Sequence, residues 1–342
     1  MSLIEGLSYV ARQGFRVAWY MGHAAAARDL GRSPEPAPNP GRRSAMAFGG
    51  LGEDVLALFR RDLRNAAMGL YPTPRDGDPL PTLLARSRAF FADVPEAARR
   101  KAEARGNEVY SDALAAELPA YFLQNFHFQS GGYLTEESAR LYDTQVEVLF
   151  QGSANAMRRQ CLVPLAAYLR GKDQRRLRLL DVGCGTGRFL RFVREAFPRL
   201  DATGTDLSAA YLDEARRHLA PYTAHFESAN AEALPFPDLS FDVLTSIYLF
   251  HEVPPEVRRR IAAEFARLLR PGGRLIFMDS LQLGDVPRFD PLLASFPRNF
   301  HEPYFESYLE EDLDALFAAA GLRPLAGEPV FLSKLVVADK PL

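Results

Sequence analysis

A glycine-rich turn is the first stretch of the chain whose residue types and spacing could do chemistry. It reads DVGCGTGRF and contains Gly183, Gly185 and Gly187. Turns of this kind, between an apolar run and a helical one, bring backbone N–H groups close to a nucleotide. Dinucleotide sites read G-x-G-x-x-G. This turn reads G-x-G-x-G and has Arg188 where the third dinucleotide glycine would stand.

Two carboxylates bear on which nucleotide the turn holds. Asp181 precedes the first glycine, at the end of a predicted strand, and is expected to face the ligand. A carboxylate there would repel a pyrophosphate, whereas S-adenosylmethionine has no phosphate and carries a cationic amine and sulfonium. Asp206, at the end of the next predicted strand, can accept hydrogen bonds from ribose hydroxyls of either ligand. The turn therefore favours S-adenosylmethionine, with an NAD-type oxidoreductase as the alternative enzyme.

Three histidines are candidates for catalysis. His251, in YLFHEVPP, follows a predicted strand, and its neighbour Glu252 could orient it or face solvent. An imidazole with an ordinary pKa near 6.5 can accept a proton at neutral pH, so His251 is the first candidate for a general base. His301 lies in a long insertion that could form a substrate wall, and His127 could close over the cofactor from the N-terminal region. For each, a purely structural role in a cap, a packed loop or an aromatic core is the alternative.

The elements that must position these residues alternate between strand and helix from residue 178 onward. LRLLDVG, LDATGTDL, TAHFESA, FDVLTSIYLF and GRLIFMDS read as strands, and two late strands are expected near 323–327 and 330–338. Ser208 is a predicted N-cap, and Ser307 with Glu310 could form a capping box for the last helix. This alternation predicts an α/β fold with a doubly wound, Rossmann-like, seven-stranded and mainly parallel sheet. Ligands bind at the carboxyl ends of such strands.

The N-terminal part has helical spacing instead. Apolar residues of the first predicted helix, 3–30, fall on one stripe formed by Leu3, Leu7, Val10, Val17 and Met21. A proline-rich connector follows at 32–43, and helices are expected over 53–70, over 81–105 and after Thr135, a predicted N-cap. These elements form the helical extension of the fold.

Four segments carry a family resemblance because they occur in order and at the expected spacing. They are LLDVGCGTGRFL, GTDLS, ANAEALPFPDLSFDVLTS and LLRPGGRLIFMDS. From about 178 to 282 the chain resembles a class I S-adenosylmethionine-dependent methyltransferase, of the group that includes the ubiquinone and menaquinone C-methyltransferases. The resemblance implies cofactor contacts from Asp181, Gly183, Gly185 and Gly187 to the methionine part, from Asp206 and Leu207 to the ribose and adenine, and from Asn230 and Ala231 to the adenine edge. Many relatives have Asp where this chain has Asn230. Tyr142, with Asp143, is a further candidate to reach the cofactor.

The resemblance implies an S-adenosylmethionine-dependent methyltransferase that acts on a small acceptor. The chain has no Asn/Asp-Pro-Pro-aromatic motif for a planar amine, and no metal-binding acidic trio of the catechol type can be placed. The long aromatic segments instead favour an apolar or aromatic molecule, and we expect O- or C-methylation. We expect residues 1–134 to form a helical lid or substrate region and residues 135–342 the S-adenosylmethionine-binding methyltransferase domain. The alternative is a non-catalytic cofactor-binding protein whose N-terminal helices dock a partner or a membrane surface.

Composition bounds the remaining partners. A net charge of −2 gives no basis for a nucleic-acid partner. The chain has two cysteines without metal-ligand spacing, and no apolar run approaches the roughly 18 residues of a membrane span. We therefore expect a cytoplasmic protein without a metal. Membrane contact through the first helix is a minor alternative, a homodimer stays open, and Arg158 and Arg159 are expected at the solvated surface.

Overall fold

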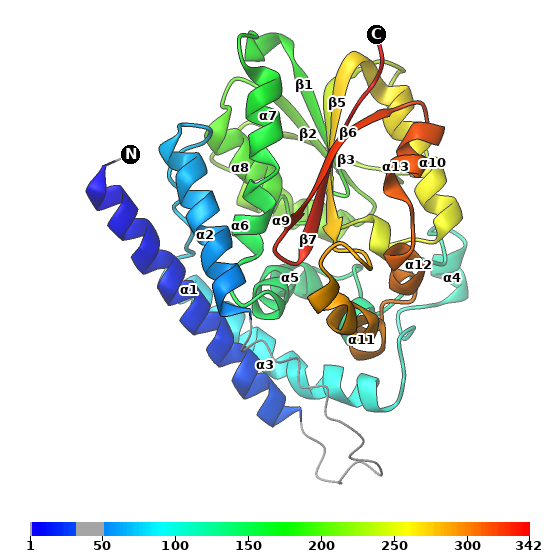
Figure 1. Cartoon of the computed structure of the whole chain (residues 1–342). Helices are drawn as coiled ribbons and strands as arrows, with labels where there is room; N and C mark the ends of the chain where they lie inside the picture. The colour runs from blue at the N-terminus through cyan, green and yellow to red at the C-terminus, as the bar shows by residue number, and fades with distance from the viewer. Residues whose placement is uncertain (1, 32–50) are drawn as a thin grey trace.

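A seven-stranded sheet forms the centre of the computed structural model, which describes residues 2–31 and 51–342 (Figure 1). The strand order is β3-β2-β1-β4-β5-β7-β6, and only β7 is antiparallel to its neighbours. The predicted proline-rich connector at 32–43 lies outside the described residues. The strands confirm the predicted fold class, and their bounds are β1 Arg178–Val182, β2 Asp201–Asp206, β3 His225–Ser228, β4 Phe241–Ile247, β5 Leu269–Ser280, β6 Arg323–Val330 and β7 Ser333–Asp339.

Helices pack on both faces of this sheet because its central strands bury side chains alternately up and down. Leu179 packs with the helices of one face and Leu180 with those of the other. The first face carries α6 (Ala154–Arg159), α7 (Leu162–Leu169), α8 (Arg188–Ala196) and α9 (Ala209–His218). The second carries α10 (Pro255–Leu268) and α13 (Leu313–Ala319).

The predicted helix caps are confirmed at two places and wrong at a third. Ser208 accepts a hydrogen bond from the backbone of Tyr211 at the start of α9, and Thr135 caps α5 (Glu136–Leu149). The predicted capping box of Ser307 and Glu310 does not form. Ser307 lies inside the short helix α12 (Phe305–Leu309), and α13 is instead capped by Asp312, whose side chain accepts from the backbone of Ala315.

Several of the remaining elements lie near the carboxyl ends of the parallel strands. In Figure 1, α1 runs along one side of the molecule, and α3, α5 and α11 lie below the sheet. The bounds are α1 Leu3–Leu30, α2 Gly52–Ala67, α3 Leu80–Ala102, α4 Asp112–Ala115 and α11 Asp290–Phe300. Four 3₁₀ helices complete the set within the described residues: η2 Phe126–Phe128, η3 Gln174–Arg176, η4 Phe250–Glu252 and η5 Pro287–Phe289.

The face of α1 that packs against the protein is not the predicted apolar stripe. Leu3, Leu7, Val10 and Met21 are exposed, at 80%, 63%, 58% and 49%. The buried face carries the polar and aromatic residues Tyr9, Gln13, Arg16, Tyr20 and His23. Tyr9 hydrogen-bonds to Asp62 of α2, His23 to Ser87 of α3, and Arg16 pairs with Glu147 of α5, and these contacts favour this orientation of the helix. None of the described helices is both long and apolar enough to cross a membrane.

Arg158 and Arg159 are a second correction, because both are buried rather than solvated. Arg159 is 2% exposed and forms ion pairs with Asp62 at 2.6 Å and with Asp76 at 2.8 Å. Tyr9 and Tyr71 also donate hydrogen bonds to Asp62, at 2.6 and 2.7 Å. A buried guanidinium is tolerated because carboxylates pair with it in this way. The cluster joins α1 and α2 to α6.

Candidate active site

The glycine-rich turn joins β1 to α8 in a conformation that suits glycine. Gly183, Gly185 and Gly187 have positive φ angles of 70°, 54° and 74°. A Cβ added to Gly185 would meet no atom within 4 Å, so this backbone is open to a ligand. A Cβ at Gly187 would come within 2.7 Å of Leu219 at the end of α9. Gly187 therefore allows two helices to pack closely, and it does not line the cavity described below.

Asp143 of α5 holds the same turn from behind. Its carboxylate accepts hydrogen bonds from Thr186 Oγ1 at 2.8 Å and from Arg188 Nε at 2.7 Å. Burial would raise the pKa of Asp143, but Arg188 and His218 beside it hold that pKa well below its usual range. Arg188, which replaces the third dinucleotide glycine, thus faces a carboxylate of the protein. Asp143 positions the turn and is not among the residues that line the adjacent cavity.

A cavity of about 100 Å³, here called the cofactor cavity, lies beside the turn at the carboxyl ends of β1, β2 and β4. The structure brings together most of the residues predicted to bind cofactor, since its lining includes Gly183, Gly185, Asp206, Leu207, Asn230, Ala231 and Tyr142. Asp181 and Gly187 are absent from the lining. Tyr133, Tyr211 and Glu252 are present and were not among the predicted cofactor contacts.

Asp206 has the geometry expected of a ribose acceptor. One carboxylate oxygen accepts from the backbone N–H of Gly185 at 2.8 Å, and the other accepts from that of Ser208 at 2.9 Å. Each oxygen of a carboxylate can accept two hydrogen bonds, so one acceptor position on each remains for a ligand. Burial raises the pKa of Asp206, and the backbone N–H groups of Ser208, Gly185 and Leu207 oppose this rise. The donors also fix the carboxylate in place.

Asn230 is partly engaged by its own loop. Its Oδ1 accepts from the backbone N–H of Glu232 at 2.9 Å. The Tyr121 hydroxyl lies 3.4 Å from that oxygen but only 2.6 Å from Glu232 Oε1, so it donates mainly to Glu232. Asn230 Oδ1 therefore keeps an acceptor position for an adenine amino group.

Asp181 lies beneath the cofactor cavity. It is 2% exposed, and its Oδ1 accepts a hydrogen bond from Thr245 of β4 at 2.6 Å. Burial raises the pKa of Asp181 to about 7. Direct contact between Asp181 and a ligand thus remains a prediction. Even without contact, an ionised Asp181 can attract a cationic ligand electrostatically.

Aromatic residues from the N-terminal region cover the cofactor cavity. The Tyr133 ring stacks on Phe126, with centroids 5.2 Å apart, and meets Tyr142 and Tyr211 edge-on. Cofactor and drug-sized ligand pockets usually measure roughly 300–1,000 Å³. The cavity is smaller than that, so this aromatic cover must move outward when a nucleoside enters.

A second cavity, of about 70 Å³, adjoins the first and is here called the reaction cavity. Tyr142, Tyr248 and Glu252 line both cavities. His127 and His251 reach the reaction cavity from η2 and η4, and most of its other walls are apolar: Val146, Leu149, Phe150, Leu292, Leu293, Phe296, Phe305 and Leu332. Two of the three predicted catalytic histidines therefore lie in one apolar space next to the cofactor cavity.

His251 is held by a carboxylate at the end of β5. Its Nδ1 lies 2.5 Å from Asp279 Oδ1, and since a carboxylate only accepts, Nδ1 carries the proton. The other Asp279 oxygen accepts from the backbone of Phe250 at 2.8 Å. Burial alone would lower the pKa of His251, but Asp279 and then Glu252 and Glu302 outweigh burial and raise it to about 9. The sequence predicted an ordinary imidazole pKa, and this expectation is corrected.

Glu252 faces both cavities and is not solvent-facing. The Tyr133 hydroxyl donates to its Oε1 at 2.6 Å, and His251 Nε2 lies 3.8 Å from the same oxygen. Burial raises the pKa of Glu252 to about 7. The site therefore places an ionisable carboxylate, rather than a fixed charge, between the two cavities.

His127 has the opposite electrostatic character from His251. Burial, and then the charge of His251, lower the pKa of His127 to about 3, so its ring is neutral at pH 7. Its Nε2 lies 3.3 Å from Glu302 Oε1. Burial raises the pKa of Glu302 well above its ordinary value. His127 also packs edge-on against Phe296 and contributes to the shape of the cavity.

His301 lies outside the reaction cavity, contrary to the expectation for a substrate wall. It ends α11 in the left-handed conformation, with φ of 46°. Its Nε2 lies 3.0 Å from Gln124 Oε1, and its ring packs against Phe128. The insertion that contains His301 does line the cavity, but through the apolar side chains of Leu293, Phe296 and Phe305.

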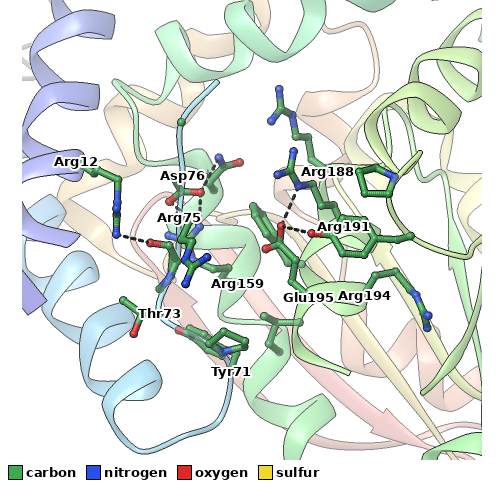
Figure 2. A pocket seen from close by; sticks show the side chains of 18 of the residues that line it. Arg12, Tyr71, Thr73, Arg75, Asp76, Arg159, Arg188, Arg191, Arg194 and Glu195 are labelled. Carbon is green, nitrogen blue, oxygen red and sulfur yellow. Dashed lines mark hydrogen bonds and ion pairs between the residues drawn. The ribbon is translucent and has the colours of Figure 1, made fainter. Parts of the chain in front are cut away.

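A larger cavity, of about 1090 Å³, lies between α1, the loop 71–78 and α8. Figure 2 shows Arg12, Arg75 and Arg159 on one side of it and Arg188 and Arg191 on the other. Arg159 and Arg191 are paired with acids, the latter with Glu195 at 2.9 Å. None of the predicted cofactor or catalytic residues lines this space. Size alone therefore does not identify the active site.

Asp279 and Tyr133 are the main residues that sequence reasoning missed. Asp279 carries a signal that could have revealed it, because it stands at the carboxyl end of a parallel strand, as Asp181 and Asp206 do. Tyr133 comes from a segment without a motif. Its position depends on how the N-terminal region packs.

Comparison with known proteins agrees with this geometry over the central part of the chain. Residues 179–273 match the methyltransferase domain family. Together with the strand order, the glycine-rich turn and the Asp206 geometry, this match identifies a class I S-adenosylmethionine-dependent methyltransferase domain in the chain. The cofactor of this domain class is S-adenosylmethionine.

Three relatives illustrate the range of similar proteins. A fatty-acid O-methyltransferase of Mycolicibacterium smegmatis is 31% identical over 41% of this chain and 52% of that protein. A ubiquinone/menaquinone biosynthesis C-methyltransferase of Desulfotalea psychrophila is 32% identical over 41% and 53%. The 27-O-demethylrifamycin SV methyltransferase of Amycolatopsis mediterranei is 34% identical over 50% and 56%. The chain spans about half the length of these relatives.

Proposed function

We propose that the protein is an S-adenosylmethionine-dependent methyltransferase that methylates an acidic O–H or C–H group of a small, apolar or aromatic acceptor. The observation that carries this proposal is the His251–Asp279 pair in an apolar cavity that shares three lining residues with the cofactor cavity. A methyl acceptor and a methyl donor must be adjacent in such a reaction, and a base must face the acceptor.

The cofactor cavity fits S-adenosylmethionine chemically. Asp206 has free acceptor positions for the ribose hydroxyls, and Gly185 leaves the backbone open to the ligand. Glu252 lines this cavity and Asp181 lies beneath it, and a cationic ligand would favour the ionised form of both carboxyl groups. When bound, the cofactor supplies an electrophilic methyl group on a sulfonium. A pyrophosphate would meet these same carboxylates, which speaks against a dinucleotide.

His251 acts as the general base in this proposal. Asp279 holds Nδ1, so Nε2 is the atom that takes the acceptor's proton, and the carboxylate stabilises the resulting imidazolium. With a pKa of about 9 the ring is mostly protonated at neutral pH. A cationic ligand in the neighbouring cavity lowers that pKa and so increases the fraction of free base. Alignment and exclusion of water by the apolar walls contribute the rest.

Residues 1–134 serve as the lid and substrate region, and residues 135–342 as the methyltransferase domain. Phe126 and Tyr133 over the cofactor cavity and His127 in the reaction cavity support this division. The acceptors named for the relatives, a fatty acid, a quinone precursor and a rifamycin, are consistent with an apolar acceptor for this chain.

The test is acceptor-dependent formation of S-adenosylhomocysteine. The protein is incubated with S-adenosylmethionine and a panel of apolar phenols, carboxylic acids and 1,3-dicarbonyl compounds, and the product is measured by mass spectrometry. Turnover above the acceptor-free rate with any of them supports the proposal. A non-catalytic cofactor-binding protein would bind S-adenosylhomocysteine and give no acceptor-dependent product with the whole panel.

A further inference from the structure

A third cavity shares lining residues with the reaction cavity. It measures about 520 Å³ and lies between α1, α3, α5 and α11. Its walls include Ala27, Val94, Ala97, Ala98, Val148 and Phe300. We call it the tail cavity. Figure 1 shows α3, α5 and α11 below the carboxyl ends of the parallel strands and α1 along one side of them.

The shared lining residues place the tail cavity next to the reaction cavity. His127, Tyr142, Val146 and Leu149 line both of them. Tyr142 also lines the cofactor cavity, so the three spaces meet around this ring. A molecule whose reactive group lies at His251 can therefore extend past His127 and Leu149 into the tail cavity.

Volume makes such an extension necessary for any acceptor of ordinary size. The reaction cavity measures about 70 Å³, whereas pockets for drug-sized ligands measure roughly 300–1,000 Å³. The cofactor cavity is reserved for the methyl donor. The tail cavity, at about 520 Å³, is the adjoining space that can hold the body of an acceptor.

The residues of the tail cavity favour an apolar occupant. Small side chains on α1 and α3, among them Ala27, Ala97 and Ala98, leave the space open. The acid Asp93 is already engaged, because Ser130 and Gln145 both donate to it. Two cations, Arg28 and Lys101, also line the cavity. Lys101 donates to Asn299 Oδ1 at 3.2 Å, and burial lowers its pKa. Most of the remaining wall can offer only van der Waals contact and exclusion of water.

We propose that the tail cavity binds the apolar tail of the methyl acceptor, so that the acceptor is an elongated molecule with its acidic group at one end. This inference rests on the proposed function for the claim that an acidic group is the end that reacts. Binding of a ligand in the tail cavity can be measured without any methyl transfer. The occupant is an alkyl or polyene chain rather than a compact aromatic ring.

The first test is equilibrium binding of cis-parinaric acid, a fluorescent long-chain carboxylic acid. The test variants are Ala97→Trp on α3 and Val148→Trp on α5, which place an indole in the tail cavity from two different helices. The control is Ala92→Trp, because Ala92 is exposed on α3 and does not line the cavity. We expect at least tenfold weaker binding for both test variants and unchanged binding for the control. Affinity for S-adenosylhomocysteine should stay within twofold in all of them.

Two results would overturn the inference. One is equal binding of the probe by the wild type and by both cavity variants, because the probe would then lie elsewhere. The other is an absence of probe binding by the wild type. Failure of the proposed function would give a different result. No acceptor would then yield S-adenosylhomocysteine, while the probe would still bind the wild type more tightly than the two cavity variants. If turnover is found, Ala97→Trp should lower kcat/KM at least tenfold for a long-chain alkylphenol and less than threefold for phenol.

Discussion

Replacing Asp279 with asparagine tests the electrostatic account of His251 most sharply. The variant keeps the shape of the side chain and an oxygen that can accept from Nδ1, but it removes the negative charge. In the structure the pKa of His251 is about 9, against an ordinary value of 6.5. The difference of about 2.5 pKa units corresponds to about 3 kcal/mol that favours the imidazolium. Without the carboxylate, burial is opposed only by the more distant acids, so the pKa of His251 should fall to 6.5 or lower.

The assay is the pH dependence of kcat/KM with S-adenosylmethionine present, combined with an NMR titration of the His251 ring in the free protein. The wild type should gain activity as pH rises toward 9, because the free base is the active form. Asp279→Asn should reach its plateau at a lower pH and at a lower maximum, since the ring loses basicity and orientation. Asp339→Asn, which removes a carboxylate paired with Arg274 instead, should leave the profile unchanged. An unaltered profile in Asp279→Asn would refute the assignment.

The same pair makes a signed prediction for stability. The folded-state pKa of His251 is raised, so its stabilising contribution is fully present below pH 6.5 and is lost as pH rises through about 9. Denaturant titrations of the wild type should therefore show this contribution disappearing across that window. Asp279→Asn should lack this component of the pH dependence.

Three other substitutions test separate parts of the site and fold. His251→Ala should lower kcat about 100-fold, the usual scale of general base catalysis, with cofactor affinity within twofold by calorimetry; an unchanged rate and pH profile would move the base elsewhere. Gly185→Val should abolish cofactor binding, whereas Gly171→Val, which also has a positive φ and open surroundings, should bind normally; equal binding by both would mean that the turn does not hold the cofactor. Arg159→Met leaves Asp62 and Asp76 buried without their cation and should cost about 3–5 kcal/mol in urea unfolding, and a loss below about 1 kcal/mol would contradict the buried ion-pair network.

The central fold was predictable because local patterns agree with its tertiary packing. The strand before the glycine-rich turn is a short, mainly apolar run, and both the strand–helix alternation and the Ser208 cap are present in the structure. The packing face of α1 was not predictable from its apolar stripe. Its buried side is selected by partners distant in sequence, such as Asp62 for Tyr9 and Glu147 for Arg16. Apolar periodicity contains no information about such pairs.

The candidate site divides in the same way. The positions of Asp206 and the glycines in the site could be predicted from motif spacing, because the end of β2 and the turn after β1 fix their geometry. The roles of the histidines depend on neighbours that the sequence does not place beside them. Asp279 lies on β5 and contacts His251, which follows the neighbouring strand β4. His301 packs against Gln124, although the insertion that contains His301 lines the reaction cavity. The shift in the pKa of His251 is a property of the assembled site.

The most direct test of the central claim is a calorimetric titration of S-adenosylhomocysteine into the wild type and into Asp206→Ala. The account predicts binding by the wild type and a loss of roughly 1.5–3 kcal/mol, or about 10- to 150-fold, in the variant, because a charged acceptor for the ribose is removed. Asp201→Ala, at the exposed start of the same strand, should bind like the wild type. Absence of binding by the wild type, or equal affinity of the wild type and Asp206→Ala, would contradict the assignment of this cavity to S-adenosylmethionine.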